Sequence, residues 1–157
     1  MKTKSENRVI HNTTSRLFKL YIFILAAINV AYIAIQMYKS KASQPFLTTG
    51  EITKAEFLKL DTLLSYSVLI ETSLIALVGL YALFIFTKNT NTLYSFVVTH
   101  IRILILFFAI SYALSWITSA SVESLSGHLL GPFLITLAVF GYYLVKRLPK
   151  RVTVKKA

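Results

Sequence analysis

Long runs of apolar residues dominate the pattern of this chain. Four such runs, separated by polar stretches, lie at about residues 20–38, 63–86, 97–120 and 129–145. At about 1.5 Å rise per residue, each run can cross a hydrocarbon layer of about 30 Å as an α-helix. Membrane β-strands would instead show about ten residues of alternating polarity, and that alternation is not seen. The sequence therefore predicts an all-α integral membrane protein whose four transmembrane helices form a helical bundle.

The chain divides into three parts by polarity. Residues 1–19 form a basic N-terminal segment, residues 20–147 hold the four-helix transmembrane domain, and residues 148–157 form a basic tail. The first apolar run is about 19 residues long, whereas the core of a signal peptide has about 7–15. We therefore expect this run to be retained as a membrane helix rather than cleaved.

Turn and capping residues mark the connections. Residues 44–46, with a central proline, predict a turn after the first helix. Thr53 and Glu56 have the spacing of a capping box, in which the threonine side chain accepts a backbone N–H and the glutamate reaches back. The second helix is therefore expected to begin outside the membrane. Gly131 and Pro132 mark the start of the fourth helix, because proline is tolerated in a first turn.

The lysines and arginines set the expected orientation. Residues 1–19 hold five of them and residues 146–157 hold six, whereas the third loop, around Glu123, holds none. Positively charged flanks stay on the cytoplasmic side. Both termini and the second loop are therefore expected in the cytoplasm. The first loop is expected outside, because its four lysines are offset by three acidic residues.

The basic residues also indicate the partners of the chain. A net charge of +11 beside membrane spans is typical of contact with anionic lipid headgroups, and no aromatic-basic motif for nucleic acid accompanies it. We expect an anionic lipid bilayer and another membrane protein, or a second copy, as partners, and no nucleic acid. The residues expected to contact lipid headgroups are Arg102, Lys146, Arg147, Lys150 and Arg151.

Composition and motifs argue against catalysis. The chain is 55% hydrophobic and only 15% charged, and it has no cysteine, which excludes thiolate chemistry. Its three histidines, His11, His100 and His128, lie at different depths, so no metal or haem site is expected. No catalytic or phosphate-binding motif is present. We predict that the protein is not an enzyme and has no cofactor.

Polar side chains gather on one side of three predicted helices. At about 100° per residue, Asn29 and Gln36 share a stripe of the first helix, and Ser111, Ser115 and His100 share a stripe of the third. In a membrane, polar and small residues turn inward and apolar residues face lipid. The candidate binding residues on this interior polar face are Asn29, Gln36, Ser67, Glu71, Thr72, Ser111 and Ser115. Packing and modest hydrogen bonds between helices are the alternative role of the serines and of Asn29.

Glu71 is the strongest functional candidate in the sequence. A carboxylate within a membrane span costs at least about 2.5 kcal/mol unless it is neutral, paired or facing water. Glu71 is therefore expected to bind a proton or cation, to make a structural hydrogen bond, or to be shielded by oligomerisation. Arg102 is not expected to pair with it, because the axial gap between them is roughly 15 Å.

Two functional classes fit these features. The first is a non-enzymatic accessory, regulatory or immunity-type interaction protein of the plasma membrane, which small size and sparse intramembrane charge favour. The alternative is a small oligomeric permease or channel that uses Glu71 as its proton or cation site. The clustered polar face favours that alternative, whereas the lack of a second deep charge or an inverted repeat disfavours it.

Overall fold

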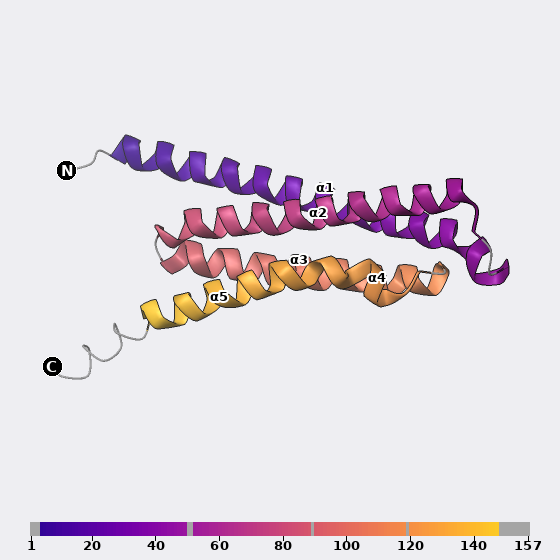
Figure 1. Cartoon of the computed structure of the whole chain (residues 1–157). Helices are drawn as coiled ribbons and strands as arrows, with labels where there is room; N and C mark the ends of the chain where they lie inside the picture. Colours follow the sequence, from indigo (N-terminus) through magenta and orange to yellow (C-terminus); the bar gives the residue numbers. More distant parts are fainter. Residues whose placement is uncertain (1–3, 50–51, 89, 119, 148–157) are drawn as a thin grey trace.

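A computed structural model describes residues 4–49, 52–88, 90–118 and 120–147, and every regular element among them is helical. Four long helical segments lie side by side, with both chain ends at the same end of the molecule (Figure 1). Three of these segments are single helices, α1 (Lys4–Thr49), α2 (Lys54–Phe86) and α3 (Thr90–Ile117). The fourth is built from α4 (Val122–Ser126), the 3₁₀ turn η1 (Gly127–Leu129) and α5 (Leu130–Arg147).

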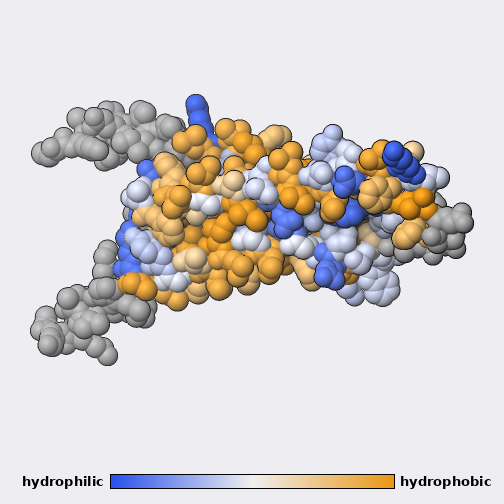
Figure 2. Space-filling model, in the orientation of Figure 1, coloured by the Kyte–Doolittle hydropathy of each residue, from blue (hydrophilic) through white to orange (hydrophobic). Residues whose placement is uncertain are grey.

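All four segments are long and apolar enough to cross a membrane. The candidate spans are Arg16–Gln44, Lys54–Phe86, Thr90–Ile117 and Val122–Arg147. The expectation of an all-α chain with four membrane-crossing helices is therefore confirmed by length and composition. Apolar residues cover most of the face shown in Figure 2, as a surface facing lipid requires.

The helices are longer than the apolar runs predicted. The predicted turn at residues 44–46 is wrong, because α1 continues without interruption to Thr49. Ala42 and Ser43 are partly buried in this stretch, and α1 packs against α2, so tertiary packing outweighs the local turn preference. The fourth segment begins at Val122, seven residues before the predicted start, because Ser121 caps α4 by accepting a hydrogen bond from the backbone N–H of Ser124.

The predicted start of α2 is confirmed. Thr53 is its N-cap, and the Thr53 side chain accepts from the backbone N–H of Glu56. The Glu56 carboxylate in turn accepts from the backbone N–H and the hydroxyl of Thr53, at 2.9 and 2.7 Å. This capping box fixes the point at which the chain turns back toward the membrane.

The core lies where all four segments meet. One cluster, centred on Leu74, Val78, Leu93, Phe96 and Val139, joins α1, α2, α3 and α5. A second cluster, which includes Ile33, Phe107, Leu125 and Leu129, joins α1 and α3 to α4 and η1. Helices α2 and α5 approach closely at Gly131, where an added Cβ would lie 2.6 Å from Cγ1 of Ile75. These contacts hold the polar residues of the interior at fixed depths.

Candidate functional site

The structure brings several of the predicted interior residues together near the turn between α3 and α4. Asn29 and Gln36 are buried on α1, and Ser111 is buried on α3. The Ser124 hydroxyl donates to Oε1 of Gln36 at 3.3 Å, and the Ser111 hydroxyl donates to the Leu125 carbonyl at 3.2 Å. These bonds connect α1 and α3 to α4, so the three elements share one hydrogen-bonded region.

His128 lies at the centre of this region, although it is not among the residues predicted for the interior face. Its side chain is fully buried, and its Nε2 lies 2.8 Å from Oδ1 of Asn29. The Tyr32 ring packs on the imidazole with 4.0 Å between ring centroids. Asn29 and Tyr32 lie one turn apart on the buried side of α1, so a single helix face supplies both contacts.

The hydrogen bonds of Asn29 determine which nitrogen of His128 carries the proton. The Asn29 amide NH₂ donates to the Leu25 carbonyl at 2.7 Å, which leaves Oδ1 as the acceptor facing His128. Nε2 of His128 must therefore be the donor, and in the neutral ring Nδ1 has only a lone pair. Within the described residues Nδ1 has no hydrogen bond of ordinary geometry, although the Leu125 backbone is close enough to interact with the ring.

A second histidine network, centred on His100, lies farther from the α3–α4 turn and was not predicted from the sequence. Nε2 of His100 is hydrogen-bonded to the Tyr21 hydroxyl, and Nδ1 lies 3.2 Å from Oγ1 of Thr136. The Thr136 hydroxyl uses its own proton on the Pro132 carbonyl at 2.8 Å. Nδ1 of His100 therefore donates to Thr136, and Tyr21 donates to Nε2. Both ring nitrogens of His100 are hydrogen-bonded, so this network holds α1, α3 and α5 together and has a structural role.

Aromatic rings enclose the His100 network. Tyr21 stacks on Tyr81 with 3.9 Å between ring centroids, and Phe96 stacks on His100 at 4.1 Å. His100 itself is 1% exposed. Hydrogen bonds to Tyr21 and Thr136 leave its ring no free nitrogen. No signal in the sequence pairs Tyr21 with His100, because 79 residues separate them.

Glu71 differs from the buried polar residues because nothing in the described chain bonds to it. It is half-buried on α2 and lies close enough to the Tyr32 hydroxyl to interact with it electrostatically. Among the described residues it makes no hydrogen bond and no ion pair. Arg102 is exposed on α3, and no ion pair between it and Glu71 is found among the described residues.

Three of the predicted interior residues bond to carbonyls of their own helices. Thr72 is exposed, and its hydroxyl donates to the Val68 carbonyl of its own helix at 2.8 Å. Ser115 is half-buried, and its hydroxyl donates to the Tyr112 carbonyl at 2.7 Å. Ser67 is buried as expected, yet it too bonds within α2, to the Leu63 carbonyl. The placement of Thr72 on the interior face is therefore wrong. A hydroxyl that bonds to its own helix needs no partner in the interior.

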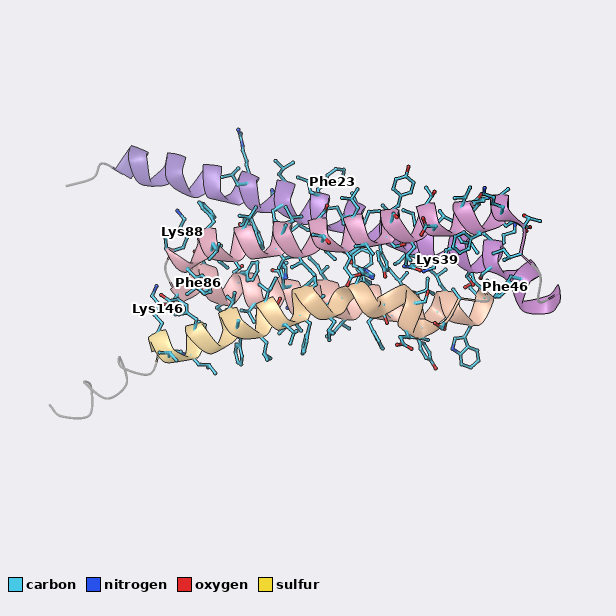
Figure 3. All side chains as sticks on the ribbon, in the orientation of Figure 1. Phe23, Lys39, Phe46, Phe86, Lys88 and Lys146 are labelled. Atoms are coloured by element: carbon cyan, nitrogen blue, oxygen red, sulfur yellow. The ribbon has the colours of Figure 1, made fainter. Side chains whose placement is uncertain are left out.

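Two of the expected headgroup contacts, Lys146 and Arg147, lie at the end of the molecule where α2 meets α3. Lys146 donates to the Lys88 carbonyl at 3.0 Å, and Figure 3 shows Lys88, Lys146 and Phe86 at this end. Arg147 donates to the Tyr143 hydroxyl at 2.8 Å, and its guanidinium carbon Cζ lies 5.8 Å from the centroid of the Tyr143 ring. Lys150 and Arg151 lie outside the described residues, and lipid contact by all of these residues stays a prediction.

The chemistry that these residues offer is hydrogen bonding and charge pairing. Within the described ranges, no group of three or more histidine or acidic side chains could hold a metal ion. The buried groups form two compact networks, one around His100 and one around His128. Tyr32, which packs on His128, also interacts electrostatically with Glu71. No known protein family, curated protein or solved structure matches this chain.

Proposed function

We propose that this chain is a non-enzymatic accessory, regulatory or immunity-type protein of the plasma membrane that acts by binding another membrane protein. Its four segments form a bundle with both termini in the cytoplasm, in agreement with the distribution of lysine and arginine. The observation that carries the proposal is a contrast. Glu71 has no bonded partner in the described chain, whereas each buried polar side chain around it makes at least one hydrogen bond.

The interior is occupied by hydrogen bonds of the chain with itself. Each fully buried polar side chain of the described residues makes at least one hydrogen bond; they are Asn29, Gln36, Ser67, His100, Ser111, His128 and Thr136. Groups paired in this way resist hydration, because each must break a bond before it can bind water or an ion. This supports a rigid scaffold more than a conducting path.

Glu71 supports a contact within the membrane plane. An ionised carboxylate in a span costs about 2.5–3.5 kcal/mol, and pairing with a donor relieves that cost. Since no hydrogen bond to Glu71 is found among the described residues, a neighbouring helix of a partner that carries a basic or hydroxyl side chain would supply the donor. Thr72, exposed next to Glu71, adds a small surface that allows such a helix to approach closely.

The test uses a photo-crosslinking amino acid placed at Thr72 in the full chain, in native membranes. Thr72 is suited to this probe because it is exposed and adjacent to Glu71. We expect an adduct with a second membrane protein that is lost with Glu71→Leu and retained with Glu71→Gln, which still forms hydrogen bonds. The matched control is the same probe at Leu106, an exposed position of α3. Adducts only with lipid at both positions would refute the proposal.

The alternative, a small oligomeric permease or channel, has one specific observation in its favour. Glu71 is only partly buried and interacts electrostatically with Tyr32, so a proton or small cation could reach it. Reconstituted in proteoliposomes, such a protein would conduct protons or cations, and Glu71→Gln would abolish the flux while folding is preserved. Absence of flux in the native protein, or full flux in the variant, would exclude this use of Glu71.

A further inference from the structure

The exposed aromatic residues define where a membrane would end on this molecule. Tyr38, Tyr66 and Trp116 are each about half exposed or more and lie on α1, α2 and α3 near the α3–α4 turn. Tyr94, near the other end of α3, is also exposed. From Tyr94 to Trp116, α3 rises by about 33 Å, close to the roughly 30 Å of a hydrocarbon layer. Tyrosine and tryptophan concentrate at such boundaries.

The helical hairpin of α1 and α2 continues beyond this boundary. Gln36 is level with Ser124, as their hydrogen bond shows, so the rest of α1 extends past the turn between α3 and α4. From Tyr38 to Thr49, α1 rises by about 16 Å. Figure 1 shows the joined ends of α1 and α2 projecting farther than that turn. We call the described part of this projection, residues 40–46 and 52–63, the head.

The head carries large apolar side chains that the chain itself does not cover. Phe57 is 59% exposed and Leu58 is 54% exposed, and Phe46 and Ile52 are also exposed. Phe57 lies nine residues from Tyr66, or about 13 Å along α2, whereas headgroups add only about 5–8 Å to each side of the hydrocarbon. These side chains therefore stand beyond the lipid, where clustered apolar residues mark a protein contact.

Positive charge borders the same surface. Lys41 and Lys54 are exposed, and the exposed Lys59 lies 5.0 Å from the centre of the Tyr38 ring. On the acidic side, the Glu56 carboxylate is engaged by Thr53 in the capping box. Figure 3 shows Lys39 and Phe46 along this end of the hairpin, and Figure 2 shows hydrophilic and hydrophobic residues interleaved there. Asp61 is exposed as well, so the described head holds three lysines against two carboxylates, and the capping box engages one of the two. The charge around the apolar side chains is therefore positive overall.

We infer that the head is a docking surface for a protein whose contact face is apolar and flanked by carboxylates. This inference rests on the proposed function and adds a second, extramembrane contact to the one at Glu71. Phe57 and Leu58 enter the apolar part of the partner surface, and Lys41 and Lys54 face its acidic side chains. Charge complementarity at such a rim steers association and selects the partner.

The test places a photo-crosslinking amino acid at Phe57 in the full chain, in native membranes. The control position is Ile117, which is 81% exposed at the same end of the molecule but not on the head. We expect Phe57, and not Ile117, to form an adduct with another protein, at a peptide that mass spectrometry shows to contain acidic and apolar residues. Combining Lys41→Glu with Lys54→Glu is expected to lower the adduct yield by about tenfold.

Every other outcome overturns the inference. Adducts at Phe57 with lipid alone, with a second copy of this chain, or with nothing would each do so, as would a yield unaffected by reversing the charges. An adduct at Thr72 that depends on Glu71, without one at Phe57, would refute the head as a docking surface and leave the proposed function intact. Loss of the adducts at both Thr72 and Phe57 would refute the proposed function as well as the head as a docking surface.

Discussion

Asn29 and His128 form a hydrogen bond whose direction is set by a third residue, Leu25. The Asn29 amide NH₂ is committed to the Leu25 carbonyl, so Oδ1 must accept, and Nε2 of His128 must donate, across 2.8 Å. The bond joins α1 to the 3₁₀ turn η1, elements that lie 99 residues apart in the sequence. It therefore links the first and last segments of the chain at one depth.

Asn29→Leu is expected to destabilise the protein because it leaves the Nε2–H of His128 buried without an acceptor. Hydrogen bonds between membrane helices contribute about 0.6 kcal/mol on average and up to about 1.7, and an orphaned buried donor costs about 1–3 kcal/mol. The free energy of unfolding in detergent should therefore decrease by about 1–3 kcal/mol. A double-mutant cycle of Asn29→Ala with His128→Ala should show coupling, and strictly additive losses would mean that the bond does not stabilise the fold.

Tyr21→Phe is expected to destabilise the protein by about 1 kcal/mol, because the ring stays while Nε2 of His100 loses its donor. The matched control is Tyr81→Phe. Its ring stacks on Tyr21, and its hydroxyl has no hydrogen bond among the described residues. Thermal unfolding in detergent should therefore shift for Tyr21→Phe and remain nearly unchanged for Tyr81→Phe. Equal shifts would show that ring packing, rather than the hydrogen bond, stabilises this region.

Gly131→Ala is expected to separate α2 from α5. The added methyl would lie 2.6 Å from Cγ1 and 2.8 Å from Cδ1 of Ile75, so the helices or the Ile75 side chain must shift. Overpacking of this kind costs about 1–3 kcal/mol. Gly141→Ala, in the same helix with nothing within 4 Å, is the control and should be neutral or slightly stabilising. Adding Ile75→Ala to Gly131→Ala should restore stability, and failure to do so would place the strain elsewhere.

The sequence predicts the helical class because hydrophobic runs of this length have one main solution in a bilayer. All four runs lie inside the observed candidate spans except at the end of the third, which extends past Ile117. Helix ends were predicted only where a local motif encodes them. Thr53 and Glu56 form the predicted capping box, whereas the extension of α1 to Thr49 depends on its packing against α2.

Polar stripes predicted the interior well on α1 and poorly on α2. Asn29 and Gln36 are buried, because amide side chains need partners from other helices. Thr72 was expected on the inner face of α2 but is exposed. The inner side of α2 is instead apolar, with Leu74, Val78 and Ile85 in the core. Serine and threonine satisfy their hydroxyls within the helix, so their position along it does not indicate which side is buried.

The pairing of Tyr21 with His100 and of Asn29 with His128 could not be predicted from the sequence. Each pair depends on the relative depth of two distant helices, which periodicity within one helix does not specify. Helical projection places a residue on a face but leaves the sliding of one helix against another undetermined. The interhelical contacts at Gly131 and in the aromatic cluster around Phe96 set that sliding.

The orientation of the chain gives a last prediction, in which structure and charge have separate parts. The bond between Ser124 and Gln36 places the α1–α2 and α3–α4 turns at one end. The bond from Lys146 to the Lys88 carbonyl places the α2–α3 turn and the end of α5 at the other. Because the basic flanks favour the cytoplasm, reporters fused near Asn89 and at Lys150 should read cytoplasmic. Reporters near Gln44 and Ser124 should read external.

The two parts of this prediction fail in different ways. If all four reporters read the opposite side, the helix arrangement stands but the orientation assigned from the lysines and arginines is wrong, and the head would face the cytoplasm. If the reporters at Asn89 and Lys150 disagree with each other, one segment does not cross the membrane. That result would contradict four crossings directly, because Lys146 and Lys88 are in contact and must lie on one side.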